Sequence, residues 1–354
     1  MLRRDTILTT LHDVPFKSVI LKYSPLFEGT IQHTIVSAEH IKFITRTHDD
    51  LIVVCNGCSI DIYNANTHLF KLRSEERYIN SIERIAICTD NRIAVAYADL
   101  KIKLWNPYTG NCEVISNYMN KSIHLISFND KIINVAEHLV EVYDPKNNCI
   151  DSTFDIYGCT CVCLNDNIII CGLNDGRIMT SQMKELHGHT MKINCVLYIK
   201  NRIISGSQDT TLKVWDDEKC IYTLQNHSAI NCLLFKDDKL IAGCNDGCIR
   251  IWKEQDNIQT LLPGTHSFVR HIDTLLDGRF ITFSNHGMIK VWNTSTKYNE
   301  KEDTSEMRPA DNNCDRILYT YDNTGSICVL TDGRVVAARI HGYTFRNIGI
   351  DILI

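Results

Sequence analysis

Apolar and polar residues alternate in short stretches along most of the chain. Stretches such as LKVW at 212–215 and IRIW at 249–252 are typical of β-strands, whose side chains point alternately to opposite faces. Short turns rich in Asp, Asn and Gly separate the stretches, and these residues tolerate the positive φ angles of a tight hairpin. The turns lie at 49–50, 90–91, 129–130, 165–166, 200–201, 237–238, 277–278 and 332–333. The pattern predicts an all-β chain of many short antiparallel strands.

The predicted strands group into a repeat of about 40 residues. Each copy holds four strands, and the third strand ends at a position that is mostly aromatic. These positions are Tyr63, Trp105, Tyr143, Ser181, Trp215, Trp252, Trp292 and Phe345. Four antiparallel strands in a unit of this length are typical of a β-propeller blade. The sequence therefore predicts a propeller with eight blades of four antiparallel strands, with seven blades as the alternative.

One copy contains the side chains of a hydrolase charge network. His189 precedes Ser205, Ser207 and Asp209, and histidine, serine and aspartate are the parts of a catalytic triad. A triad occurs once in a protein, beside a pocket and an oxyanion hole. Here the aspartate recurs with the repeat, at positions that include Asp99, Asp175 and Asp246. We therefore interpret the group as a structural network, in which buried polar side chains satisfy one another.

Two dipeptides of the fifth copy carry a family resemblance. Gly188-His189 and Trp215-Asp216 resemble the WD40 repeat family, and the repeat extends from about residue 40 to the C-terminus. The resemblance implies a hydrogen-bond network within one blade. Its members would be His189, Ser205 or Ser207, Asp209 and Trp215, with a second network in the sixth copy made of His227, Asp246 and Trp252.

Two segments do not follow the repeat. Residues 1–38 form an N-terminal extension that could supply a ring-closing strand to the propeller of residues 39–354, although IGIDILI at 348–354 competes for the same place. Residues 293–316 are polar and charged, and they predict a long surface loop between the third and fourth strands of the seventh blade.

Two further departures lie at single positions. His286 and Arg339 stand where other copies have an acidic turn residue, and we expect both on one face of the ring as candidate partner-binding residues.

Composition narrows the possible functions. The net charge of -5 predicts no bulk attraction to nucleic acid or to an anionic membrane. No apolar run approaches the ~18 residues of a membrane span, and no export signal is apparent. The 16 cysteines lie scattered among apolar strands, so we expect buried thiols in a reducing, intracellular compartment, the cytoplasm, with a virus particle as the alternative for a viral protein. Neither the Cys55–Cys58 pair nor Cys159, Cys161 and Cys163 has the full ligand set of a metal site, and we expect no metal and no cofactor.

These observations, together with the resemblance, predict a non-enzymatic scaffold that binds one or more proteins and takes no small-molecule substrate. One alternative is a nucleic-acid or ribonucleoprotein component, which would need a local basic patch. A second is a substrate receptor of a ubiquitin ligase. A third is an enzyme of another propeller family, which would need a metal or carboxylate cluster at the central channel.

Overall fold

The structure is a computed structural model of the 354-residue chain. It describes residues 18–20, 31–37, 41–64, 67–73, 81–117, 121–165, 168–261, 267–275, 279–284, 288–292, 314–319, 327–329, 335–341 and 347–353.

Seven four-stranded antiparallel sheets follow one another along the described chain, and we number them as blades one to seven. Blades one to three are built from β3 (Ile41–Arg46), β4 (Ile52–Asn56), β5 (Ser59–Asn64), β6 (Thr67–Arg73), β7 (Ile82–Ile87), β8 (Ile93–Tyr97), β9 (Lys101–Trp105), β10 (Cys112–Asn117), β11 (Ser122–Phe128), β12 (Lys131–Ala136), β13 (Leu139–Asp144) and β14 (Cys149–Asp155). Blades four and five are built from β15 (Cys159–Asn165), β16 (Ile168–Leu173), β17 (Ile178–Thr180), β18 (Glu185–Leu186), β19 (Ile193–Ile199), β20 (Arg202–Ser207), β21 (Thr211–Asp216) and β22 (Lys219–Gln225). Blades six and seven are built from β23 (Ile230–Lys236), β24 (Lys239–Cys244), β25 (Ile249–Lys253), β26 (Asp256–Leu261), β27 (Val269–Thr274), β28 (Phe280–Ser284), β29 (Met288–Trp292) and β30 (Cys314–Tyr319).

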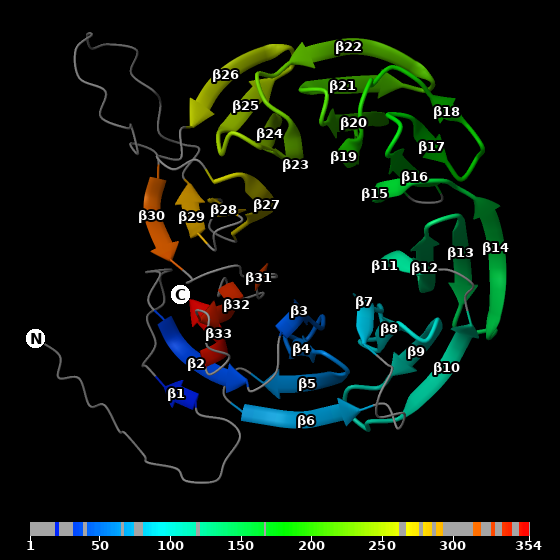
Figure 1. Ribbon diagram of the computed structural model, residues 1–354, viewed down its shortest axis with the longest axis vertical. Helices are drawn as coiled ribbons and strands as arrows, with labels where there is room; N and C mark the ends of the chain where they lie inside the picture. The colour runs from blue at the N-terminus through cyan, green and yellow to red at the C-terminus, as the bar shows by residue number, and fades with distance from the viewer. Residues whose placement is uncertain are drawn as a thin grey trace, which may run out of the picture.

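An eighth sheet closes the ring by joining both ends of the chain (Figure 1). From the centre outward its strands are β31 (Ile327–Val329), β32 (Val335–His341), β33 (Asn347–Leu353), β2 (Ile31–Ser37) and β1 (Ser18–Ile20). The two terminal segments are therefore neighbours and do not compete for one place. The predicted all-β propeller of four-stranded antiparallel blades is confirmed for seven blades. The closing sheet takes the eighth place in the ring, with five strands where four were predicted.

The predicted phase of the eighth copy is wrong. Val335 pairs with Leu353 at the position where Ile203 pairs with Trp215 in blade five, so Leu353 takes the place of the aromatic residue. Phe345, which was assigned to that place, precedes β33 and lies outside the described residues. In the predicted loop at 293–316, residues 293–313 also lie outside them, whereas the last three residues begin β30.

The hairpin turns have the backbone that their residues favour. In the turn between β23 and β24, Asp237 and Asp238 have φ angles of 50° and 57°. Asn129 and Asp130 between β11 and β12 likewise have positive φ. Two consecutive residues with positive φ match the right-handed twist of the flanking strands.

Successive antiparallel strands place the connections alternately at two ends of each blade. The top face, as we define it, carries the turns between second and third strands and the connections between blades. The bottom face carries the turns between first and second and between third and fourth strands. The first strand of every blade lies nearest the centre (Figure 1).

The hydrophobic core lies between adjacent blades. Ile170 and Ile178 of blade four pack against Ile193, Ile203 and Trp215 of blade five in one buried cluster. Second strands such as β4 and β8 are buried along their whole length because another blade covers each of their faces. Each blade therefore depends on its neighbours to bury its apolar surface.

Side-chain hydrogen bonds link the inner strands around the centre. A donor near the start of each inner strand reaches a backbone carbonyl of the next inner strand at six boundaries among the described blades. The pairs are Lys42 to Ile82, Arg84 to Ile123, His124 to Thr160, Thr160 to Ile193, Asn194 to Ile230 and Asn231 to Val269. All six boundaries between consecutive blades from one to seven are thus joined by a side-chain hydrogen bond as well as by apolar packing.

Candidate functional site

The predicted network of blade five is present and runs through three hydrogen bonds. His189 Nδ1 lies 2.8 Å from Asp209 Oδ2, and His189 Nε2 lies 2.8 Å from Ser205 Oγ. Trp215 Nε1 donates to the same Ser205 oxygen over 2.8 Å. Ser205 thus accepts from the indole and donates to the imidazole, which connects the top-face turn to the middle of the blade.

Ser207 has a separate role. Its hydroxyl lies 3.0 Å from the carbonyl oxygen of Met191 and 2.9 Å from that of Lys192, and its Oγ accepts from the Asp209 amide. It therefore holds the connection that enters blade five, whereas Ser205 belongs to the network. The sequence left this choice open, and the structure assigns the two serines to different bonds.

The protonation states in the network favour structure over catalysis. Burial lowers the pKa of His189, although Asp209 opposes the shift. Burial raises the pKa of Asp209, but hydrogen bonds from Thr211, from the Thr190 amide and from His189 outweigh it, and the net shift is downward. A neutral imidazole therefore lies beside an ionised carboxylate. The Ser205 hydroxyl is fully buried and both of its roles are taken, so no substrate can reach it.

An exposed aromatic pair lies on the top face above blades three and four. Tyr157 follows β14 and is 64% exposed. Its ring centroid lies 5.2 Å from that of His138, which is in the turn between β12 and β13. Ile156 donates its backbone N–H to the His138 carbonyl, and Asn174 donates its N–H to the Gly158 carbonyl. Backbone bonds on both sides therefore hold Tyr157 in an exposed position.

A third exposed side chain extends this surface toward blade five. Met191 is 46% exposed and lies in the connection between β18 and β19. The turn of blade four packs closely against this connection, since a Cβ added at Gly176 would lie 3.1 Å from the Met191 carbonyl oxygen. We call His138, Tyr157 and Met191 the top-face patch.

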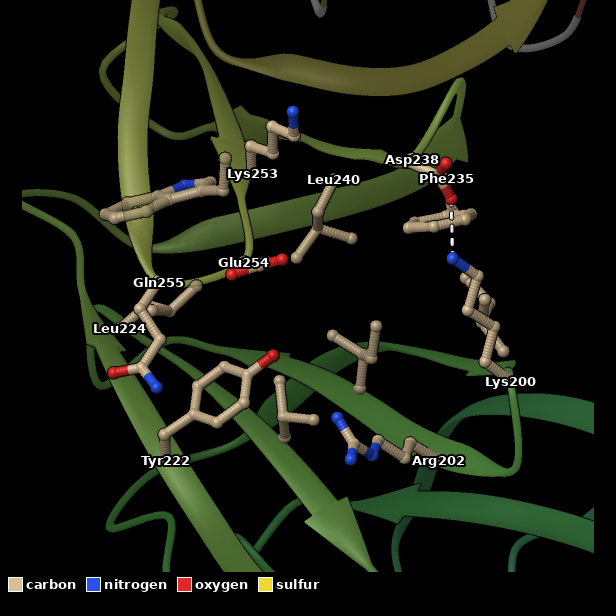
Figure 2. A pocket seen from close by; sticks show the side chains of 14 residues that line it. Lys200, Arg202, Tyr222, Leu224, Phe235, Asp238, Leu240, Lys253, Glu254 and Gln255 are labelled. Atoms are coloured by element: carbon tan, nitrogen blue, oxygen red, sulfur yellow. Dashed lines mark hydrogen bonds and ion pairs between the residues drawn. The ribbon is translucent and has the colours of Figure 1, made fainter.

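A cavity of about 650 Å³ lies between blades five and six, and we call it the 5/6 cleft (Figure 2). Its floor is apolar and includes Ile204 and Val214 of blade five and Leu240 and Trp252 of blade six. The volume is within the range of sites that hold small ligands or single side chains of a partner.

Charged and polar side chains form the rim of the 5/6 cleft. Lys200 and Asp238, from bottom-face turns of the two blades, form an ion pair with 2.5 Å between Nζ and Oδ1. Arg202 and Tyr222 extend into the cleft from blade five, and Glu254 does so from the turn after β25 (Figure 2). The cleft therefore combines an apolar floor with hydrogen-bond donors and acceptors at its mouth.

Comparison with known proteins agrees with this geometry. The family model described as "WD domain, G-beta repeat" matches residues 180–216 and 218–253, which include the strands of the blade-five network. The fold resembles the crystal structure of the WD40 beta propeller domain of Doa1, with a TM-score of 0.57 and 11% identity over 92% of this chain and 97% of that one. This chain contains WD40 repeats and has the fold of a WD40 β-propeller.

Two more relatives are informative about the WD40 propeller. The crystal structure of the computationally designed Ika8 protein has a TM-score of 0.68 and 18% identity over 90% of this chain and 98% of that one. The ubiquitin homeostasis protein lub1 of Schizosaccharomyces pombe is 33% identical over 88 residues, which are 24% of this chain. The matched part spans 12% of lub1, so the relationship concerns a small part of that protein.

The predicted WD40 network of blade six is wrong at its histidine. Asn226 occupies the place of His189, because Ile230 pairs with Cys244 as Ile193 pairs with Ser207 in blade five. His227 is the next residue along, and it is exposed.

The other two members of that predicted network have different surroundings. Asp246 binds Arg250, with 2.6 Å between Oδ2 and the guanidinium. The indole N–H of Trp252 is buried and has no partner among the described residues. The physical reason is that Ala242 stands opposite Arg250 at the position that Ser205 occupies opposite Lys213.

The predicted position of Arg339, one of the two candidate partner-binding residues, is also wrong. Arg339 lies within β32, opposite Gly349, and not in a turn equivalent to that of Asp209. His286 lies outside the described residues. The role of His286 in partner binding stays a prediction. The expectation that His286 and Arg339 lie on equivalent turns of neighbouring blades is wrong.

By residue type, two further groups are candidate sites within the described part of the chain. Cys55 and Cys58 lie in different surroundings, since Cys55 is buried and Cys58 is exposed. Over the described residues, no three His, Cys, Asp or Glu side chains are grouped closely enough to hold a metal ion. In the same residues no helix has the length and apolar character of a membrane span.

Sequence reasoning missed the top-face patch and the 5/6 cleft. Tyr157 and Met191 lie in connections between blades, where the repeat imposes no residue type. The signal for the cleft was available only by comparing copies: Ile221 of blade five stands where blade three has Asp151.

Proposed function

We propose that this WD40 propeller is a non-enzymatic platform that binds a protein partner through its top face. WD40 propellers are generally non-catalytic scaffolds, and a closed ring of mutually buried blades offers a rigid surface. The observation that carries the proposal is Tyr157, a large aromatic side chain that is 64% exposed on a backbone fixed by hydrogen bonds. Rigid aromatic residues lose little entropy on binding and are enriched among the residues that dominate interface energies.

The charges around the patch indicate what kind of surface it would bind. Glu137 and Asp155 are exposed and flank the His138–Tyr157 pair, and neither has an ion-pair partner among the described residues. Arg177 nearby is already shared between Asp175 and Glu185. An exposed aromatic ring beside two unneutralised carboxylates favours a partner that presents lysine or arginine.

The test is affinity capture from cells of the source organism with quantitative mass spectrometry, followed by binding measurements with the purified partner. Tyr157→Ala should weaken binding by about 1–3 kcal/mol if the ring is an interface anchor. Tyr108→Ala is the matched control, because Tyr108 is also exposed but belongs to blade two on the bottom face. Equal binding by wild type and Tyr157→Ala, with a loss in Tyr108→Ala, would place the partner elsewhere.

A ubiquitin-related role is a second candidate. It is favoured by the similarity to a protein named for ubiquitin homeostasis. Titration of the propeller with purified ubiquitin, monitored by calorimetry, tests this candidate directly. Saturable binding that weakens in Tyr157→Ala would support it, and the absence of heat at millimolar ubiquitin would reject it.

A further inference from the structure

The 5/6 cleft belongs to a series of equivalent cavities between blades. A cavity of about 360 Å³ lies at the same place between blades three and four, and one of about 230 Å³ lies between blades four and five. The 5/6 cleft, at about 650 Å³, is the largest of the three. The three linings can therefore be compared position by position.

The two smaller cavities neutralise their own cations. Lys131, the first residue of β12, pairs with Asp151 of β14 at 2.5 Å between Nζ and Oδ2. In the cavity between blades four and five, Lys184 pairs with Asp217. Each cation thus has a counter-ion from the protein itself.

The 5/6 cleft lacks the corresponding counter-ion. Arg202 begins β20 as Lys131 begins β12, because each pairs with the last residue of the strand before it. The position of Asp151 is taken by Ile221, which is 40% exposed. No ion pair of Arg202 occurs among the described residues. Its guanidinium faces the cleft with five donors that no described carboxylate neutralises in an ion pair.

A second donor faces the same space. The hydroxyl of Tyr222 points toward the middle of the cleft (Figure 2). Trp252 contributes apolar surface to the floor. The donors therefore favour a ligand with carbonyl or carboxylate oxygens.

The charge balance and the apolar floor further limit the class of ligand that the cleft can bind. Once the Lys200–Asp238 pair is set aside, Arg202 and Lys253 face Glu254 alone, which leaves an excess of positive charge. The apolar floor accommodates one or two hydrophobic side chains. Glu254 offers an acceptor for an N–H group, so the rim suits a peptide main chain, which presents both donors and acceptors.

We propose that the 5/6 cleft binds a short peptide segment of a partner protein, with apolar side chains on the cleft floor and an adjacent acidic side chain on Arg202. The proposal deepens the proposed scaffold function, since it adds a second surface of different chemistry from the top-face patch. The top-face patch is flanked by Glu137 and Asp155 and would bind a basic partner surface, whereas the cleft would bind an acidic and apolar one.

The experiment uses the full chain and three fluorescein-labelled, capped heptapeptides. The first carries two leucines followed by an aspartate in a glycine-serine background, the second replaces the aspartate by asparagine, and the third replaces both leucines by serine. Fluorescence anisotropy should show saturable binding of the first peptide, with each replacement weakening it about tenfold, which equals 1.4 kcal/mol. Equal binding of all three peptides would overturn the proposal.

Two variants test the role of the missing counter-ion. Ile221→Asp restores the carboxylate found in blade three and should weaken the first peptide about tenfold without altering the cleft floor. Arg202→Glu should weaken it at least as much, and Arg202→Lys, which keeps the charge but not the planar fork of donors, should weaken it less than Arg202→Glu does. Wild-type affinity in Ile221→Asp and Arg202→Glu together would refute the assignment to Arg202.

Two controls separate this proposal from its alternatives. Tyr157→Ala should bind the first peptide as wild type does, so a failure of the top-face proposal leaves this measurement unaffected. Free 4-methylpentanoate, a small carboxylate with the leucine side chain, should compete only weakly. Competition by 4-methylpentanoate at the concentration of the peptide would mean that the cleft binds small carboxylates, and it would overturn the peptide assignment.

Discussion

Ser205 offers the sharpest test of the blade-five network. Its single hydroxyl serves both neighbours, since it accepts from Trp215 Nε1 and donates to His189 Nε2. Ser205→Ala removes only one oxygen atom from a fully buried position, so it leaves the backbone and the apolar packing almost unchanged. The loss of stability should therefore report on hydrogen bonding alone.

The magnitude follows from what the substitution leaves unpaired. Trp215 is fully buried and would lose the acceptor of its indole N–H, and His189, which is 6% exposed, would lose the donor to Nε2. An unsatisfied buried group costs about 1–3 kcal/mol. Because one hydroxyl links the two groups, the costs are not independent, and we expect a total loss of about 2–4 kcal/mol in the free energy of unfolding.

Urea unfolding followed by far-ultraviolet circular dichroism measures this quantity without depending on the emission of Trp215. Ser152→Ala is the matched control, because Ser152 is exposed on β14 and its removal should change stability by no more than about 0.5 kcal/mol. If Ser205→Ala lost no more stability than Ser152→Ala, the network would not support the blade as we describe. A hydrolytic activity that Ser205→Ala abolished at unchanged stability would refute the structural interpretation altogether.

Three further predictions rest on other contacts. Gly206→Ala should destabilise the protein by about 1–3 kcal/mol in the same urea assay, because the new Cβ would lie 2.6 Å from Ile230 Cγ2 and 2.8 Å from Cys195 Sγ; wild-type stability would mean that blades five and six can separate at no cost. Asn194→Leu should lower the thermal midpoint by removing the donor that reaches the Ile230 carbonyl at 2.9 Å, and an unchanged midpoint would show that apolar packing alone joins the inner strands. Because burial lowers the pKa of His189 and His124 below the usual 6.5, the stability that they contribute is complete above pH 6.5 and is lost as the pH falls through their folded-state pKa values. The urea midpoint should therefore fall between pH 7 and pH 5, and less so in His189→Gln; a midpoint that rises over this range would contradict the direction of both shifts.

The propeller ring was predictable because the same residue pattern occurs in many copies along the chain. Turn residues, alternating strands and the aromatic position recur often enough that no single degenerate copy obscures the period. Phase was harder to predict where the marker residues have changed. In blade six a histidine, His227, lies one residue after the position equivalent to His189, and the sequence pattern alone therefore favoured His227 over Asn226. The pairing of Ile230 with Cys244 shows that Asn226 occupies the equivalent position.

The surfaces were less predictable because they depend on contacts between copies. Ser205 and Ser207 point to the same face of β20, so alternation alone could not assign them. Likewise, no rule within one repeat shows that Ile221 leaves Arg202 without a carboxylate. That conclusion required the strand registers of blades three and five and the residues that line the cavity between blades five and six.

Blade six lacks the hydrogen-bond network of blade five, and one added oxygen atom should restore part of it. Ala242 occupies the place of Ser205, and two groups around it are orphaned: the Trp252 indole N–H and the side-chain oxygen of Asn226. A serine hydroxyl at 242 could accept from the first and donate to the second, as Ser205 does with Trp215 and His189. Ala242→Ser should therefore stabilise the fold by about 0.5–1.5 kcal/mol, although it adds a polar group to a buried site where such changes usually destabilise. The same urea assay measures the gain, and Ala94→Ser in blade two is the matched control, since Ala94 is equally buried and its surroundings include no such pair of orphans. If both serines destabilised the protein alike, Trp252 and Asn226 would lie out of reach of position 242. Ala242 does not line the 5/6 cleft, so Ala242→Ser should in either case leave the affinity of the leucine-aspartate peptide unchanged.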